Sequence, residues 1–143
     1  FDLTGNPFLV SENGLVMDKD KTKVITYASG YKVDGTNYQT SIRVPETVKT
    51  IGVSALSYAP YLTEIILPSG LTRIEDQAFE STGNLKELVI PMSVQFVGYR
   101  AFNGWRIGSR LTFECSATYA AMHFDLEYLN GVSSKTTVVT YNG

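Results

Sequence analysis

Cysteine and histidine are almost absent from this 143-residue sequence, which contains one of each, Cys115 and His123. A single cysteine excludes an internal disulfide, and a zinc site would need further ligands from elsewhere in the chain. No apolar run approaches the roughly 20 residues that a membrane-spanning helix needs, so we expect no membrane insertion by this segment. The sequence begins at Phe1 without a signal-peptide pattern, and we interpret it as a mature or trimmed chain that lacks any targeting segment.

An excess of charge of one sign is also missing. Twelve basic and 14 acidic residues give a net charge of −2, and no basic cluster indicates a nucleic-acid partner. The 12 glycines form no phosphate-binding fingerprint, so no cofactor is expected. The 43% apolar and 18% charged residues are too apolar a mixture for disorder, and the length fits one domain.

Proline recurs at a fixed interval. Pro45, Pro68 and Pro91 lie 23 residues apart, and cutting the chain there gives three units with matching columns. The shared small and apolar residues are Ala55, Ala78 and Ala101, then Leu56, Phe79 and Phe102, then Leu62 and Leu85. The third unit departs from the last column with Gly108, and we expect Ile107 to fill that space. A period of this length is typical of leucine-rich repeats.

Each unit ends in a short apolar segment that predicts a strand, at 65–67, 88–90 and 111–113. Residues 42–44 lie one period upstream and predict a fourth rung of the same parallel ladder. Proline has no N–H and cannot continue the ladder, which explains why it ends the strand at the same point in each unit. The following block, "IEDQAF", predicts a strand end and then one helical turn, with Asp76 as its cap.

The segment "LPSGLTRIEDQAFESTGNLKELVIP" closely resembles the BspA-like class of leucine-rich repeats. The shared features are the proline after the strand, the I-x-x-x-A-F block and the N-L-K-E-L-x-I-P return, and the resemblance is strong over residues 41–113. It implies a mostly β fold with short helical turns: a right-handed solenoid of about three to four 23-residue rungs. Common leucine-rich repeats stack asparagine or cysteine inside the turn, whereas this chain has Thr47, Gly70 and Ser93, so we expect no asparagine ladder.

We predict a single domain, 1–143, with an N-terminal β-hairpin cap (1–40), the repeats (41–113) and a C-terminal cap (114–143), because a solenoid must cover its apolar ends. Asn13-Gly14 indicates a tight turn between two short strands. Apolar residues at helical spacing predict a helix in the second cap: Tyr119, Met122, Phe124 and Leu126. Asn130-Gly131 then turns the chain into a last strand, "TTVVTY".

No group of residues favours catalysis or metal binding. Asp18-x-Asp20 is similar to the start of a calcium loop, but lysines surround it and a plain hairpin turn is favoured. Cys115 and His123 are interpreted as cap or surface residues, since nothing near Cys115 would activate a thiolate. Glu75 and Asp76 are neighbours in a predicted turn, where a cap fits better than an acid–base pair. We therefore predict that the chain is not an enzyme and has no metal site.

The family resemblance implies a protein that is exported to the cell surface or secreted, and that binds a host or bacterial surface protein in adhesion. Repetition supports this, because a solenoid offers an extended face. Two alternatives stay open. Trp105 and the nine tyrosines could stack on sugars in a carbohydrate-binding module, and the chain could be a structural spacer of a larger surface protein.

The binding face is predicted from side-chain alternation in the strands. Each predicted strand has an apolar pair that we expect to point inward, and the residues beside that pair then point outward. The inward pairs are Ile42 and Val44, Ile65 and Leu67, Leu88 and Ile90, and Leu111 and Phe113. Stepping by 23 residues gives a first outward row of Ser41, Glu64, Glu87 and Arg110. The second outward row contains Arg43, Ile66, Val89 and Thr112. Glu64 and Glu87 should be like-charged neighbours, and Ile66 with Val89 should form a small exposed apolar strip that suits a protein contact.

Overall fold

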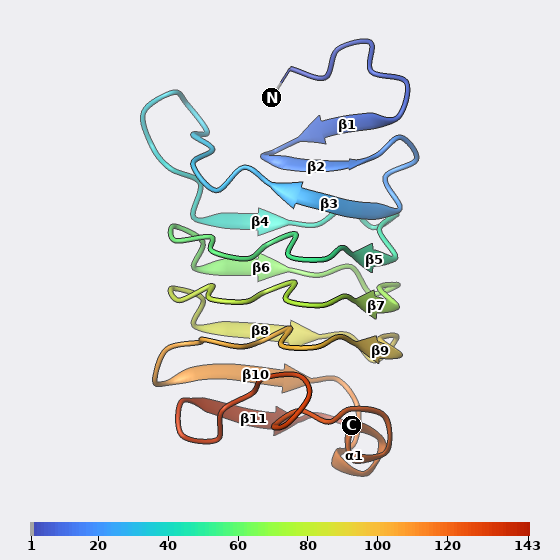
Figure 1. The fold of residues 1–143 in the computed structure, drawn as a ribbon, viewed down its shortest axis with the longest axis vertical. Helices are drawn as coiled ribbons and strands as arrows, with labels where there is room; N and C mark the ends of the chain where they lie inside the picture. The colour runs from blue at the N-terminus through green and yellow to red at the C-terminus, as the bar shows by residue number, and fades with distance from the viewer. Residues whose placement is uncertain (1) are drawn as a thin grey trace.

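Two β-sheets run along a short solenoid in the computed structural model, which describes residues 2–143 (Figure 1). The first sheet contains, in spatial order, β1 (Leu9–Glu12), β2 (Leu15–Asp18), β3 (Lys23–Tyr27), β5 (Thr50–Ile51), β7 (Arg73–Ile74) and β9 (Phe96–Val97). The second contains β4 (Ser41–Arg43), β6 (Glu64–Ile66), β8 (Glu87–Ile90), β10 (Ser109–Phe113) and β11 (Thr137–Tyr141). The predicted mostly β leucine-rich-repeat solenoid is confirmed.

The second sheet is the ladder predicted from the 23-residue period. Ile42 pairs with Ile65, and Leu88 pairs with Leu111, all in parallel register and one period apart. The Val44 N–H donates to the Ile66 carbonyl at 2.9 Å. The chain then reaches proline, and pairing stops because the ring carries no N–H. Identical columns therefore lie one above another along the solenoid.

A second parallel ladder, on the other side of the coil, was not predicted. The two-residue strands β5, β7 and β9 continue the sheet that β3 begins, again with partners one period apart, as for Ile51 and Ile74. The strands of this ladder are short because the chain leaves extended geometry directly after Ile51, Ile74 and Val97.

The prediction of a helical turn in "IEDQAF" is wrong in detail. Positive φ values recur at the tenth residue of each unit, with 53° at Ser54, 57° at Gln77 and 54° at Arg100. Alternate N–H groups here donate to the next unit, as from Phe79 to the Ala101 carbonyl, so they are not available for helical bonds. Asp76 likewise does not cap its own turn, because its Oδ1 accepts from the Tyr99 N–H at 2.8 Å.

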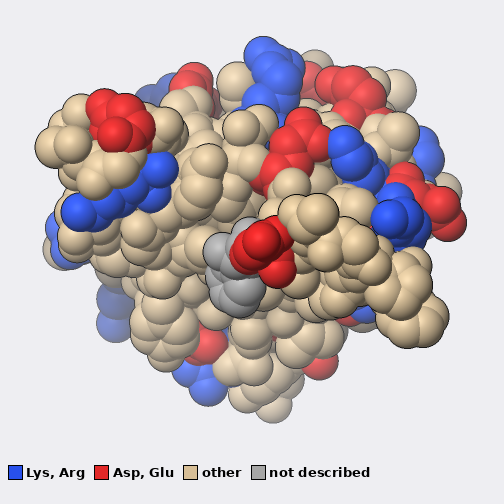
Figure 2. All heavy atoms as spheres, turned by 90° about the horizontal axis from the view of Figure 1, so that it is seen from above, with Lys and Arg blue, Asp and Glu red and all other residues tan. Residues whose placement is uncertain are grey.

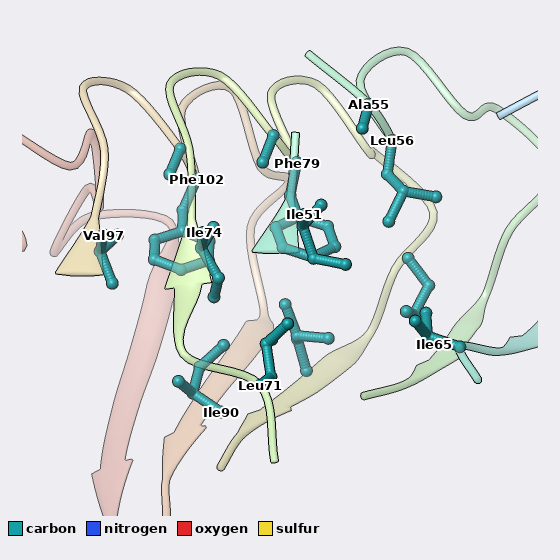
Figure 3. Packing of buried hydrophobic residues seen from close by; sticks show 14 of the residues in the cluster. Ile51, Ala55, Leu56, Ile65, Leu71, Ile74, Phe79, Ile90, Val97 and Phe102 are labelled. Carbon is teal, nitrogen blue, oxygen red and sulfur yellow. The ribbon is translucent and has the colours of Figure 1, made fainter. Parts of the chain in front are cut away.

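The core fills the space between the two ladders. The alanine column and the Leu56, Phe79 and Phe102 column are at most 2% exposed, and Figure 3 shows the larger side chains pointing into the interior. The Phe79 and Phe102 rings stack with centroids 6.1 Å apart, so one unit packs directly on the next. Leu67 is the exception among the residues predicted to point inward. It lies one residue beyond the end of β6 and is only partly buried.

Ile107 does not fill the space left by Gly108; its side chain is 85% exposed. Trp105 brings additional volume to this unit instead, in a column where the earlier units have the smaller Ala59 and Thr82. The indole lies edge-on to Phe102 with centroids 5.7 Å apart, and its Nε1 donates to the Phe79 carbonyl at 2.8 Å. A buried hydrogen-bonded indole therefore replaces the expected aliphatic contact.

The N-terminal hairpin forms as predicted. Strands β1 and β2 are antiparallel, and Asn13 and Gly14 between them have φ values of 48° and 80°. Both central residues of a tight type I′ turn require positive φ, which asparagine and glycine adopt readily. Strand β3 then pairs in parallel with β5, so the hairpin and the two-residue strands form one continuous sheet.

The C-terminal segment contains one helix, α1 (Ala117–His123), whose N-cap Ser116 accepts from the Tyr119 N–H. The helix is shorter than the apolar spacing suggested, because Phe124 is already extended and Met122 is 76% exposed. The predicted last strand is β11, which pairs in parallel with β10. No helix among residues 2–143 has the length and apolarity that crossing a membrane requires.

Asn130 substitutes for a missing rung at the end of the first sheet, beyond β9. In the preceding rungs a main-chain carbonyl accepts a main-chain N–H from the next unit, as Ile74 does from Gly98 at 2.8 Å. At Val97 the donor is instead the side-chain Nδ2 of Asn130, at 2.9 Å, which also lies 3.0 Å from the Gly98 carbonyl oxygen. Asn130 is fully buried, and its amide thus satisfies the edge that the last two-residue strand would leave open.

Candidate functional site

The outer face of the second sheet holds the predicted binding residues in the predicted rows. Register places Ser41 beside Glu64, Glu64 beside Glu87, and Glu87 beside Arg110. Seven of the eight residues in the two outward rows are exposed or partly buried. The face is therefore open along β4, β6 and β8, where backbone pairing holds the side chains in line.

Thr112 is the member of the rows that differs from the expectation, because it is only 5% exposed. Strand β11 continues the ladder and brings Thr140 beside it, with the two hydroxyl oxygens 2.7 Å apart. The Thr112 hydroxyl also lies 3.1 Å from Glu87 Oε1, to which it donates. Thr112 thus positions Glu87 and offers little surface of its own.

A hollow of about 480 Å³ lies over the middle of this face, and we refer to it as the ladder hollow. Its lining residues are Glu46, Thr63, Glu64, Ile65, Ile66, Leu67, Ser69, Lys86, Glu87, Val89, Pro91 and Glu114. Ile66 and Val89 from the second outward row both line it, on the neighbouring strands β6 and β8. The hollow brings together the paired glutamates and the aliphatic pair that the sequence predicted to be neighbours.

Sequence reasoning missed Glu46 and Glu114. Both lie beyond the strands, where the prolines of the repeat turn the chain. Glu114 occupies the column of Pro45, Pro68 and Pro91, since it follows Pro91 by one period, and its N–H donates to the Ile90 carbonyl. Continuing the proline column past the third unit would have found Glu114; Glu46 had no comparable signal.

Two of the four carboxylates that line the ladder hollow, Glu64 and Glu87, accept hydrogen bonds from hydroxyl groups, and none of the four forms an ion pair within residues 2–143. Glu64 Oε2 accepts from the Ser41 hydroxyl at 2.6 Å, as Glu87 does from Thr112. The four ion pairs within residues 2–143 involve other carboxylates, those of Glu12, Glu75 and Glu80. Adjacent rungs are about 4.8 Å apart, so Glu64 and Glu87 repel each other and their charge is available to a partner.

Charge is distributed differently at the N-terminal end of the solenoid. Viewed from that end, Figure 2 shows acidic and basic residues interspersed, without an area of one sign. The partly buried Lys21 and Lys23, for example, pair with Glu12 and Glu75. The ladder hollow therefore differs from this surface in leaving like charges unpaired.

The tryptophan proposed for sugar stacking is not on the surface. Trp105 is 4% exposed and hydrogen-bonded inside the core. Tyr38 and Tyr61 are exposed, but their rings stack on each other with centroids 3.8 Å apart, and Lys32 lies over Tyr38. The carbohydrate alternative thereby loses its principal residue.

The residues considered for chemistry have structural surroundings. Cys115 is buried, and burial raises the pKa of its thiol, which disfavours a nucleophilic thiolate. His123 is exposed, stacks on the Tyr119 ring and lies 2.8 Å from the Tyr119 carbonyl through Nδ1. Glu75 pairs with Lys23 at 3.0 Å, and Asp76 accepts from the Tyr99 N–H at 2.8 Å. No group of three metal-ligating side chains occurs within residues 2–143.

Asp18 serves the turn that follows it. Its carboxylate accepts from the Thr22 and Lys23 N–H groups and from the Thr22 hydroxyl. Partial burial raises the pKa of Asp18, but these hydrogen bonds outweigh burial and hold the pKa below its ordinary value. The predicted hairpin turn is therefore closed by Asp18 itself.

Comparisons with known proteins agree with this architecture. The family model described as "BspA type Leucine rich repeat region" matches residues 22–121 in six copies. A leucine-rich repeat protein from Eubacterium ventriosum is similar in structure, with a TM-score of 0.66 and 28% identity over 77% of this chain. The pneumococcal vaccine antigen PcpA shares the fold, with a TM-score of 0.59 and 23% identity over 96% of this chain. Comparison with curated proteins gives no match.

The aligned region is a minor part of both structures. This chain covers 28% of the Eubacterium protein and 35% of PcpA. Both comparisons therefore describe the repeat fold of a segment.

Proposed function

The chain belongs to the BspA-type leucine-rich-repeat family, and we propose that it is a non-catalytic protein-binding module of an exported or cell-surface bacterial protein. The family fold is generally a scaffold without catalytic chemistry, which is consistent with a protein-interaction role. On this proposal the partner is a surface protein of a host or of another bacterial cell, and the module contributes to adhesion.

The observation that carries the proposal is the ladder hollow. Its lining combines the aliphatic Ile66 and Val89 with charged residues. Protein interfaces likewise combine an apolar core with a polar rim. Val89 is 40% exposed in a strand whose alternate residues are fully buried. Covering this strip with a partner would remove apolar surface from water, the main favourable contribution in most protein associations.

Rigidity of the face also favours binding. The side chains of the two outward rows project from paired strands in fixed register. Two residues of the first row, Glu64 and Glu87, are further held by hydroxyl groups of Ser41 and Thr112. A surface already ordered before binding loses less conformational entropy when the partner arrives.

The test is a charge and polarity reversal of the face. A triple variant, E64K/I66D/E87K, should lose capture of the surface protein that the wild-type chain retains on beads from bacterial or host-cell surface extracts. A matched variant, D20K/I25D/E127K, makes the same changes at exposed residues outside the face and should retain that protein. Thermal unfolding followed by circular dichroism checks that both variants are folded. Equal capture by the folded triple variant would exclude this face as the site.

A further inference from the structure

We propose that the ladder hollow takes an extended, positively charged segment of the partner protein, in which two basic residues flank one aliphatic residue. This inference rests on the proposed binding function and specifies the chemistry of the partner.

The first argument is the charge of the hollow. Four glutamates and one lysine line it, whereas the whole chain has 14 acidic and 12 basic residues. Ten acidic and 11 basic residues therefore lie elsewhere, so the net negative charge of the chain is concentrated at this site. Arg110 stands beside Glu87 in the register but forms no ion pair with it within the described residues. A cationic partner would meet carboxylates that no side chain already neutralises.

The second argument is the order of residues along the strands. Glu64 and Glu87 stand at the first residues of β6 and β8, and Ile66 and Val89 follow two residues later. Beyond the strands, Glu46 lies one period from Ser69, and Glu114 one period from Pro91, so the two flank the other end of the hollow. Along the strand direction, acidic residues therefore come first, aliphatic residues second and acidic residues again last.

The third argument is length. The hollow follows the chain from Thr63 through β6 and past its end to Ser69, and five residues of extended chain span about 16 Å. An extended peptide of five residues would turn its first, third and fifth side chains towards the face. The complementary pattern is therefore basic, any residue, aliphatic, any residue, basic, and acidic residues at both ends allow either chain direction.

Other cations fit the site less well. No set of three ligating side chains that could hold a metal ion occurs within residues 2–143. A free polyamine could meet the carboxylates but lacks a branched side chain to cover Ile66 and Val89. The geometry favours a peptide, whose aliphatic side chain contacts Ile66 and Val89 while its basic side chains reach the glutamates.

The experiment is a titration of the isotope-labelled chain with short peptides, followed through its backbone amide NMR signals. The first probe is Gly-Lys-Ser-Val-Ser-Lys-Gly with blocked ends. One comparison probe has glutamate in place of lysine, a second has serine in place of valine, and spermine is the third. We expect the first probe to shift the amide signals of Glu64, Ile66 and Val89, and to bind at least about tenfold more tightly than the glutamate peptide in low salt.

Variants connect binding to the carboxylates. Each exposed ion pair contributes about a two- to fivefold change in affinity, so E64Q/E87Q should weaken binding of the lysine peptide about tenfold. The matched variant D20N/E127Q removes two exposed charges outside the hollow and should bind as the wild type does. Raising the salt concentration to about 0.3 M should reduce the affinity of the wild type more than that of E64Q/E87Q.

The outcomes separate this inference from the proposed function. If the lysine peptide binds no better than the glutamate peptide, or shifts signals on another surface, the chemistry assigned here is wrong. Spermine binding as tightly as the lysine peptide, with the same shifts, would identify a polyamine site and also overturn it. In each case the capture experiment still tests the proposed binding function separately. Whether E64K/I66D/E87K loses the captured surface protein does not depend on these peptides.

Discussion

Replacing Asn130 should open the end of the first sheet beyond β9, because its side chain performs the task of a missing strand. In Asn130→Ala the Val97 carbonyl loses the Nδ2 donor at 2.9 Å, whereas the Gly98 carbonyl keeps a long contact of 3.4 Å with the Ala101 N–H. A buried carbonyl left without its partner costs about 1–3 kcal/mol. We expect the free energy of unfolding to fall by about 2 kcal/mol.

Asn130→Asp has the same shape and should be worse at neutral pH. Its carboxylate oxygen would lie where Nδ2 now lies, 2.9 and 3.0 Å from two carbonyl oxygens, and fully buried. An unpaired buried charge costs about 3–5 kcal/mol. Burial and the carbonyl groups would raise the pKa of this carboxyl in the folded state above its unfolded value of about 3.9. The folded variant is therefore most stable below that unfolded value and loses stability as pH rises through the folded pKa.

Urea unfolding measures these differences, with the fluorescence of Trp105 as a probe of the adjacent core. The control is Asn13→Asp, which changes the exposed asparagine of the other Asn-Gly pair and should alter stability by less than about 0.5 kcal/mol. The deficit of Asn130→Asp relative to wild type should narrow as pH falls towards 3. If the free energy of unfolding of Asn130→Asp is less than about 0.5 kcal/mol below that of wild type at pH 7, or the difference does not change with pH, then Asn130 does not take the place of a rung.

Substitutions at three further positions test the repeat, the turn between β2 and β3, and the binding face. Phe79→Ala should lower the free energy of unfolding by about 3–5 kcal/mol through a core cavity, whereas Phe79→Leu, which copies Leu56 of the same column, should cost less than about 1.5 kcal/mol; equal losses in denaturant melts would contradict the column assignment. Asp18→Ala should lower the free energy of unfolding by about 1 kcal/mol at pH 7. Because the pKa of Asp18 is lowered in the folded state, the stabilisation by its carboxylate is present above about pH 4 and disappears as pH falls further. Unfolding of wild type and variant across a pH series measures this difference. Glu64→Gln should raise the melting temperature slightly at low salt, since it relieves repulsion from Glu87 worth about 0.2–1 kcal/mol, and an increase unaffected by salt would argue against this cause.

The second ladder shows why part of the fold could not be predicted. Its strands are two residues long, as in β7, which is too short for an alternating apolar pattern to appear. The left-handed residues Ser54, Gln77 and Arg100 that follow these strands have no common side-chain chemistry. Their φ values result from hydrogen bonds to the next unit, which form only when the units stack.

The candidate site was predicted in part. Its rows came from alternation in the strands, which is a local property, and Glu64, Ile66, Glu87 and Val89 lie as expected. The hollow itself depends on Glu46 and Glu114, which reach it from units that are distant in sequence. The burial of Thr112 depends on β11, which pairs with β10 outside the 23-residue period.

The amino-acid sequence by itself determined the repeat, its inward columns, the strand ends at proline and the hairpin at Asn13-Gly14, because each depends on residue spacing or on local backbone preference. Tertiary structure alone decided which donors close the last rung, as Asn130 does for Val97 from 33 residues away. It also decided that Trp105 is buried and Ile107 exposed. These outcomes depend on how the final unit packs and on which polar groups would otherwise be buried without partners, and neither is visible until the chain is folded.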